Sequence, residues 1–86
     1  MEEKEIGFVS NYFGKISVAA IEITDDTVSI GDTLHFVGST TDFKMTVDSM
    51  QVEHETVSEA RKGGSVGLKV PERVRKSDKV YKVTGK

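Results

Sequence analysis

Apolar and polar residues alternate with a period of two along most of this chain, and turn residues interrupt the alternation at short intervals. The clearest example is Gly64–Val70, in which Val66, Leu68 and Val70 alternate with small or polar residues. A strand with one buried face requires this pattern. Thr33–Val37 repeats it between two Gly-containing turns. The spacing of strands and turns predicts an all-β chain.

Two segments keep the alternation but change its phase. In Lys44–Glu53 the apolar residues move from one parity to the other near Asp48-Ser49. One extra residue there would turn all of them inward, so we expect a β-bulge at that point. Ile16–Ile23 shows a similar shift.

The predicted fold is a closed or nearly closed antiparallel Greek-key β-barrel of about six to seven strands. We expect its first strand at Ile6–Tyr12 and its last at Lys79–Val83. Thr56–Lys62 and Glu72–Lys76 are candidates for single helical turns, too short to be stable alone. The barrel would occupy residues 6–83 of one domain, with short tails at residues 1–5 and 84–86. The expected core is Ile6, Val9, Val18, Ile21, Ile23, Ile30, Leu34, Phe36, Val47, Met50, Val52, Val66, Leu68, Val70 and Val80.

Composition narrows the classes of function. The chain has 86 residues and no cysteine, which excludes disulfides, thiolate nucleophiles and Cys-ligated zinc. It contains no apolar run of about 18 residues that could span a membrane as a helix. The N-terminal residues are acidic and unlike a secretory signal. We therefore expect a cytoplasmic protein without membrane contact.

The charges divide sharply along the chain. Residues 1–59 carry 3 Lys/Arg and 12 Asp/Glu, a net charge of −9, whereas residues 60–86 carry 9 and 2, a net charge of +7. Either the two halves interleave and their charges pair across neighbouring strands, or the basic half forms a binding surface for an anionic partner.

The order and spacing of these segments resemble a known family. VSIGDTLHFVG (Val28–Gly38) resembles a Gly-Asp turn segment in the β-barrel second domain of translational GTPases, the elongation and initiation factors. Thr46–Val70, with its GGSVGLKV end, and VRKSDKVYKV (Val74–Val83) are similar to the following segments, although Ser77 stands where glycine is usual. The opening Ile6–Ile23 is similar to the first hairpin of that domain.

The resemblance covers residues 6–83 and implies a non-catalytic module that contacts ribosomal RNA, tRNA or a translation-related protein. Similar barrels also occur at the C-terminal end of collagenase-like peptidases and as small stand-alone proteins. This chain most resembles the stand-alone translation-elongation-factor-like proteins, which have no GTPase domain.

The sequence predicts no enzyme, no cofactor and no metal site. A phosphate-binding loop G-x-x-x-x-G-K-[ST] is missing, so we expect no nucleotide binding. The two histidines, His35 and His54, are too few for a catalytic zinc site and are expected to face solvent. Ser49, His54 and Asp48 lie in no nucleophile motif.

Binding by the basic half remains the positive candidate. Arginine holds phosphate in a bidentate manner, and phosphate backbones attract clusters of Lys and Arg. An RNA-binding function requires one continuous basic face, with Tyr12, Phe13, Phe43 and Tyr81 as stacking candidates. The alternative, a protein-interaction adaptor, requires an exposed apolar patch, such as one that includes Phe13, Phe43 or Met45. The candidate binding residues are Arg61, Lys62, Lys69, Arg73, Arg75, Lys76 and Lys79.

Overall fold

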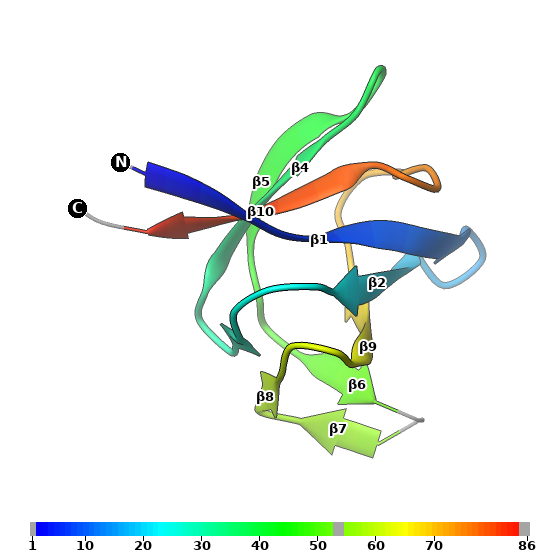
Figure 1. Cartoon of the computed structure of the whole chain (residues 1–86). Helices are drawn as coiled ribbons and strands as arrows, with labels where there is room; N and C mark the ends of the chain where they lie inside the picture. Colours follow the sequence, from blue (N-terminus) through cyan, green and yellow to red (C-terminus); the bar gives the residue numbers. More distant parts are fainter. Residues whose placement is uncertain (1, 53–54, 85–86) are drawn as a thin grey trace.

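A computed structural model describes residues 2–52 and 55–84 of the chain, and within them it contains strands and no helix (Figure 1). The all-β prediction is therefore confirmed for the described residues. No helix in that part of the chain could cross a membrane. The strands are β1 (Glu2–Phe13), β2 (Val18–Ile23), β3 (Val28–Ser29), β4 (Thr33–Val37), β5 (Asp42–Thr46), β6 (Met50–Val52), β7 (Glu55–Val57), β8 (Glu59–Ala60), β9 (Ser65–Lys69) and β10 (Lys79–Thr84).

Eight strands form one antiparallel sheet in the order β5-β4-β10-β1-β2-β9-β6-β7, and β3 pairs with β8 in a second, two-stranded sheet. The two ends of the large sheet, β5 and β7, do not pair with each other. Of the predicted closed or nearly closed barrel of about six to seven strands, the antiparallel all-β architecture is confirmed for the described residues, but they form ten strands and the large sheet is not closed into a barrel. Residues 47–49 nevertheless link edge strand β5 to β6 near the opposite edge, as Figure 1 shows. So short a link spans at most about 14 Å, so the sheet must curl strongly.

The phase change in Lys44–Glu53 has a different cause from the bulge that we expected. β5 ends at Thr46 and β6 begins at Met50, so the chain leaves one strand and enters another. Val47 lies between these strands and belongs to neither. Its N–H donates to the Asp32 carbonyl at 2.8 Å, and its carbonyl accepts from the Gly31 N–H at 2.8 Å. Glu53 lies outside the described residues. Bulges occur instead in β1, between Glu5 and Gly7 and between Val9 and Asn11.

The expected helical turns are absent from the described residues. Within Thr56–Lys62 the chain forms the end of β7 and then β8, and Glu72–Lys76 is an irregular loop between β9 and β10. β1 and β10 are both longer than expected and pair from Glu2↔Thr84 to Phe8↔Lys79. This long antiparallel pair places β10 between β1 and β4, at the middle of the sheet.

The core lies inside the curl of the large sheet, and most of the expected residues are in it. Val18 and Val52 are only partly buried, and Ile30 is 43% exposed. Ile30 follows β3 at the start of a turn, where its N–H donates to the Ser58 carbonyl at 3.1 Å, so the alternation stops before it. Five buried apolar residues were not expected to be in the core: Ala19, Val28, Phe43, Ala60 and Val74.

His35 connects three strands on the outer side of the sheet. Its Nδ1 lies 2.8 Å from Glu3 Oε1 on β1, and its Nε2 lies 2.5 Å from Asp42 Oδ1 on β5. The side chain is 16% exposed, less than an outward-facing strand residue was expected to be. Asp42 first and Glu3 second raise the pKa of His35, because both carboxylates hydrogen-bond the imidazolium.

The raised pKa of His35 predicts a stability that falls as pH rises. The protonated ring contributes fully below its unfolded pKa of about 6.5, and the contribution is lost as pH rises through the higher folded pKa. Between about pH 6 and pH 9, we expect the melting temperature of the parent chain to fall by a few degrees more than that of His35→Gln. Thermal melts followed by circular dichroism measure this. Identical pH profiles for the two proteins would contradict the role of His35.

Candidate functional site

The loop between β9 and β10 is fixed to the hairpin formed by β1 and β2. At its start, the Val70 N–H donates to the Ser17 carbonyl at 2.8 Å. At its end, the Ser77 N–H donates to the Val9 carbonyl at 2.8 Å, and the Val9 N–H donates to the Asp78 carbonyl at 2.8 Å. In the middle, Val74 is only 1% exposed and belongs to the core. The loop is therefore held at both ends and at its centre.

Asp78 shapes the last turn of this loop. The residue is almost buried, at 6% exposure, and its carboxylate accepts a hydrogen bond from the Arg75 N–H at 2.9 Å. The Asp78 N–H donates in return to the Arg75 carbonyl at 3.1 Å, and Ser77 between them has a φ of 75°. Gly38 packs directly against the Asp78 carboxylate, and any Cβ at this glycine would overlap it. The backbone of the basic segment thus has one defined conformation.

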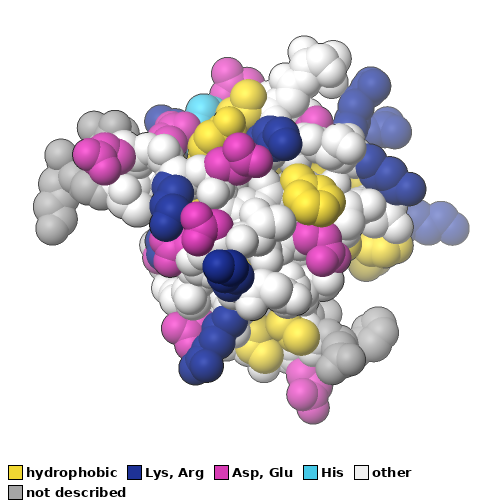
Figure 2. Space-filling model, in the orientation of Figure 1, with side chains coloured by type: hydrophobic (Ala, Val, Ile, Leu, Met, Phe, Trp, Pro, Cys, Tyr) yellow, Lys and Arg dark blue, Asp and Glu magenta, His cyan; other side chains and the backbone are white. Residues whose placement is uncertain are grey.

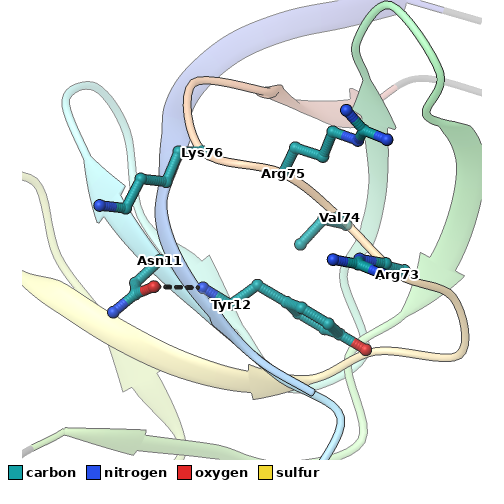
Figure 3. Close-up of a pocket in the computed structure, with 6 residues that line it drawn as sticks. All are labelled: Asn11, Tyr12, Arg73, Val74, Arg75 and Lys76. Atoms are coloured by element: carbon teal, nitrogen blue, oxygen red, sulfur yellow. Dashed lines mark hydrogen bonds between the residues drawn. The ribbon is translucent and has the colours of Figure 1, made fainter.

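A shallow pocket of about 340 Å³ lies between this loop and β1. Its lining is Asn11, Tyr12, Arg73, Val74, Arg75 and Lys76 (Figure 3). In Figure 3, Val74 lies at the centre, with Arg73 and Tyr12 on one side and Lys76 and Asn11 on the other, while the Arg75 side chain extends away from β1. The Asn11 carboxamide oxygen accepts from the Tyr12 N–H at 2.8 Å (Figure 3). Three cationic side chains and no carboxylate line this pocket.

The candidate binding residues do not form one continuous face. Arg73, Arg75 and Lys76 meet at the pocket, and Figure 2 shows a group of Lys and Arg side chains at the right-hand edge, beside the same loop. Lys69 lies at the end of β9 and lines a separate hollow of about 150 Å³ together with Val18, Ser49, Met50, Gln51 and Gly67. Arg61 and Lys62 lie in the loop after β8, and Lys79 is on β10.

Several cations of the basic half are paired with acids. Lys79 Nζ lies 3.4 Å from Glu5 Oε2, and Arg61 Nε lies 3.7 Å from Glu59 Oε1. Lys82 Nζ lies 3.4 Å from Asp32 Oδ2 and donates to the Thr27 carbonyl at 2.8 Å. Part of the charge asymmetry is thus neutralised across neighbouring elements. Among residues 2–52 and 55–84, no ion pair involves the three cations of the pocket.

Asp26 is held in its ionised form at the other end of the molecule. The Thr27 N–H donates to Asp26 Oδ1 at 2.7 Å, and the ammonium groups of Lys82 and Lys4 lie within 3.9 Å of its carboxylate. The backbone hydrogen bond first, and the positive charges second, lower the pKa of Asp26. These contacts stabilise the fold. They also show that Asp26, in the acidic half of the chain, is already paired with lysines of the same molecule.

Sequence reasoning found the three cations of the pocket but missed Asn11, because no motif surrounds it. Tyr12 was named only as a stacking candidate, and it is half-buried against the core. Of the other aromatic candidates, Phe43 is buried, Tyr81 is half-buried and Phe13 is 46% exposed. Met45 is also partly buried. Within the described part of the chain, no three His, Cys, Asp or Glu side chains come together as a metal site would require. His54 lies outside the described residues.

Comparison with known proteins links this chain to peptidases. It is 46% identical over 78 residues to an uncharacterized protease of Methanocaldococcus jannaschii, and 36% identical over 78 residues to a collagenase of Porphyromonas gingivalis. Each match covers 90% of this chain but only 19% and 22% of the relative. The chain thus spans about a fifth of the length of the curated relatives that it matches. No protein-family profile matches it.

Solved structures show the same fold. The C-terminal domain of a Geobacillus thermoleovorans protein assigned as a U32 peptidase superposes with a TM-score of 0.86. The alignment is 19% identical and covers 94% of this chain and 93% of that domain. The selenomethionine variant of the same domain gives a TM-score of 0.83. This likeness establishes the arrangement of strands, and the sequence relatives carry the functional argument.

These matches correct the resemblance to the second domain of translational GTPases, which is wrong. The Gly31-Asp32 and Ser77-Asp78 turns and the short strands beside them reflect the geometry of a small curled sheet, and unrelated β-domains share such geometry. The predictions of a translation-factor-like module in contact with RNA or the ribosome, and of an adaptor as its alternative, are overturned with it. The prediction of no enzyme is also wrong, because the relatives are named protease and collagenase. The match covers only about a fifth of each relative, so the lack of catalytic motifs in this chain says nothing about the other four fifths of those proteins.

Proposed function

We propose that residues 1–86 form one peptidase-associated domain, equivalent to the C-terminal domain of U32-type peptidases, which promotes hydrolysis of polypeptides by a catalytic portion. The observation that carries this proposal is the 46% identity to an uncharacterized protease, which extends over 90% of the chain. The fold likeness to the C-terminal domain of a protein assigned as a U32 peptidase supports the same assignment. The cytoplasmic location expected from the sequence stays a prediction.

The proposal is tested by exchanging domains in the Porphyromonas gingivalis collagenase, which is 36% identical to this chain over 78 residues. The matching segment is removed in one variant and replaced by this chain in another. We expect removal to lower the hydrolysis of gelatin severalfold and the replacement to restore most of it, because this chain is 36% identical to the segment that it replaces.

The control for this exchange is a third variant that carries the matching segment of the Methanocaldococcus jannaschii relative, which is 46% identical to this chain. Circular dichroism and gel filtration establish that each variant is folded. The proposal is wrong if the shortened collagenase is as active as the parent. It is also wrong if the variant with this chain is folded but no more active than the shortened protein, while the control variant is active.

A further inference from the structure

We propose that the pocket between β1 and the loop of residues 73–76 binds an acidic segment of a polypeptide. In this proposal Arg73 and Lys76 contact the carboxylates and Phe13 contacts an apolar neighbour. The inference deepens the proposed function and rests on it for the class of ligand, since polypeptides are what peptidases act on. It assigns a site and a ligand chemistry to one face of the domain.

The charge of the lining is the first argument. Among the described residues Arg73, Arg75 and Lys76 have no ion-pair partner, a property they share with Lys15, Lys62 and Lys69. They differ from those three in lining one pocket together. The chain as a whole has a net charge of −2, so this local excess of positive charge is not a general property of the surface. Arginine and lysine that are exposed and unpaired attract carboxylates, and arginine can hold one with two parallel hydrogen bonds.

The rigidity of the loop is the second argument. Its backbone is fixed by the hydrogen bonds of Val70, Ser77 and Asp78 and by the burial of Val74. The cations are therefore presented from a backbone that is already ordered before a ligand binds. A site of this kind loses less conformational entropy on binding than a flexible basic tail would lose.

The surroundings of the pocket favour a peptide over a phosphate-rich ligand. Phe13 follows Asn11 on β1 at a spacing of two, so the two side chains lie on the same face of the strand. Phe13 is 46% exposed, and Ile16 in the adjacent turn is 60% exposed. Apolar side chains beside cations match a segment in which acidic and apolar residues alternate. Single-stranded RNA would need several exposed aromatic faces, and Tyr12 of the pocket is half-buried.

Fluorescence anisotropy on the 86-residue chain tests the inference. The probe is a short fluorescein-labelled peptide of alternating Glu and Leu, and the reference is the same labelled peptide with Gln in place of Glu. We expect the Glu peptide to bind more tightly, and added salt to weaken it. The double variant Arg73→Gln, Lys76→Gln should lose about tenfold in affinity. The matched control, Arg61→Gln with Lys62→Gln, removes the same charge from a loop outside the pocket and should change the affinity less than about twofold.

Three results would overturn the inference. They are equal affinity for the Glu and Gln peptides, an equal loss in the control double variant, and tighter binding of oligouridylate or inorganic phosphate than of the Glu peptide. The domain exchange separates this inference from the proposed function. If the exchange protein is active but this chain does not bind the Glu peptide, the binding role of the pocket is wrong and the proposed function stands. If the exchange protein is inactive but this chain binds the peptide through Arg73 and Lys76, the proposed function is wrong and the binding role of the pocket stands.

Discussion

Replacement of Phe36 by alanine is expected to lower the free energy of unfolding by about 3–5 kcal/mol. Phe36 is fully buried on β4, and its ring stacks on that of Phe43 with centroids 5.0 Å apart. In the sheet it lies between Val80 of β10 and Phe43 of β5. Among the described residues β5 is an edge strand that pairs with β4 alone, so loss of the ring removes core volume and the stacking contact with Phe43 at this edge.

Urea unfolding followed by circular dichroism measures the effect of Phe36→Ala. A domain of this size is stable by only about 5–15 kcal/mol, so the midpoint should move strongly and the melting temperature should fall by more than about 12 °C. Phe13→Ala is the matched control, because the same atoms are removed from a side chain that is 46% exposed. We expect the control to cost less than about 1 kcal/mol. Similar losses in both variants would contradict the central place of Phe36 in the core.

Strand positions were predictable wherever the alternation was long and bounded by turns. Val66, Leu68 and Val70 are all buried, as are Leu34 and Phe36. The physical reason is that a strand at the middle of a sheet must bury every second residue, so the pattern is strict there. β9 and β4 each have two neighbours in the large sheet.

The prediction failed where the chain leaves a strand. Val28 and Ile30 are two residues apart and would face the same side of a strand, yet Val28 is buried and Ile30 is 43% exposed. The reason is that a turn begins between them and includes Gly31, which has a φ of 95°. The phase change at Val47 likewise marks a strand end and not a bulge. In both cases the backbone N–H donates to a residue far away in the sequence, Ser58 for Ile30 and Asp32 for Val47. A local pattern of apolar residues does not reveal such partners.

The candidate pocket was half visible in the sequence. Arg73, Arg75 and Lys76 lie close together in the chain, so their cluster is evident from the sequence. Lys79 forms an ion pair with Glu5, and this pairing depends on the register of β1 with β10, which the sequence does not show. Asn11 lines the pocket because β1 lies beside the loop, to which Val9 is joined by hydrogen bonds with Ser77 and Asp78. The collagenase-like peptidases were named among the proteins with similar barrels, but the resemblance to translation factors was preferred, because turn-and-strand motifs reflect local geometry that many small β-domains share.

Replacement of Gly7 by alanine is expected to cost about 3 kcal/mol or more of stability, which is large for the addition of one methyl group. A Cβ at Gly7 would overlap the backbone carbonyl oxygen of Glu22 and lie 3.3 Å from the Ile23 Cα on β2. Neither atom is the end of a flexible side chain, so the backbones of β1 and β2 must separate. β1 lies between β10 and β2, so this displacement would act on the centre of the sheet.

Gly67→Ala is the matched control for Gly7→Ala, because both glycines are in strands that pair with β2. A Cβ at Gly67 would meet Val18 Cγ1 at 3.5 Å and the Gln51 carbonyl oxygen at 3.7 Å, which are ordinary contacts. Alanine also restricts the unfolded chain, so this variant should be neutral or more stable by about 0.4–1 kcal/mol. Thermal and urea unfolding of the two variants measure the difference. Equal stability of the two variants would contradict this prediction. It would mean that β1 and β2 can accommodate a methyl group at Gly7 without loss of stability.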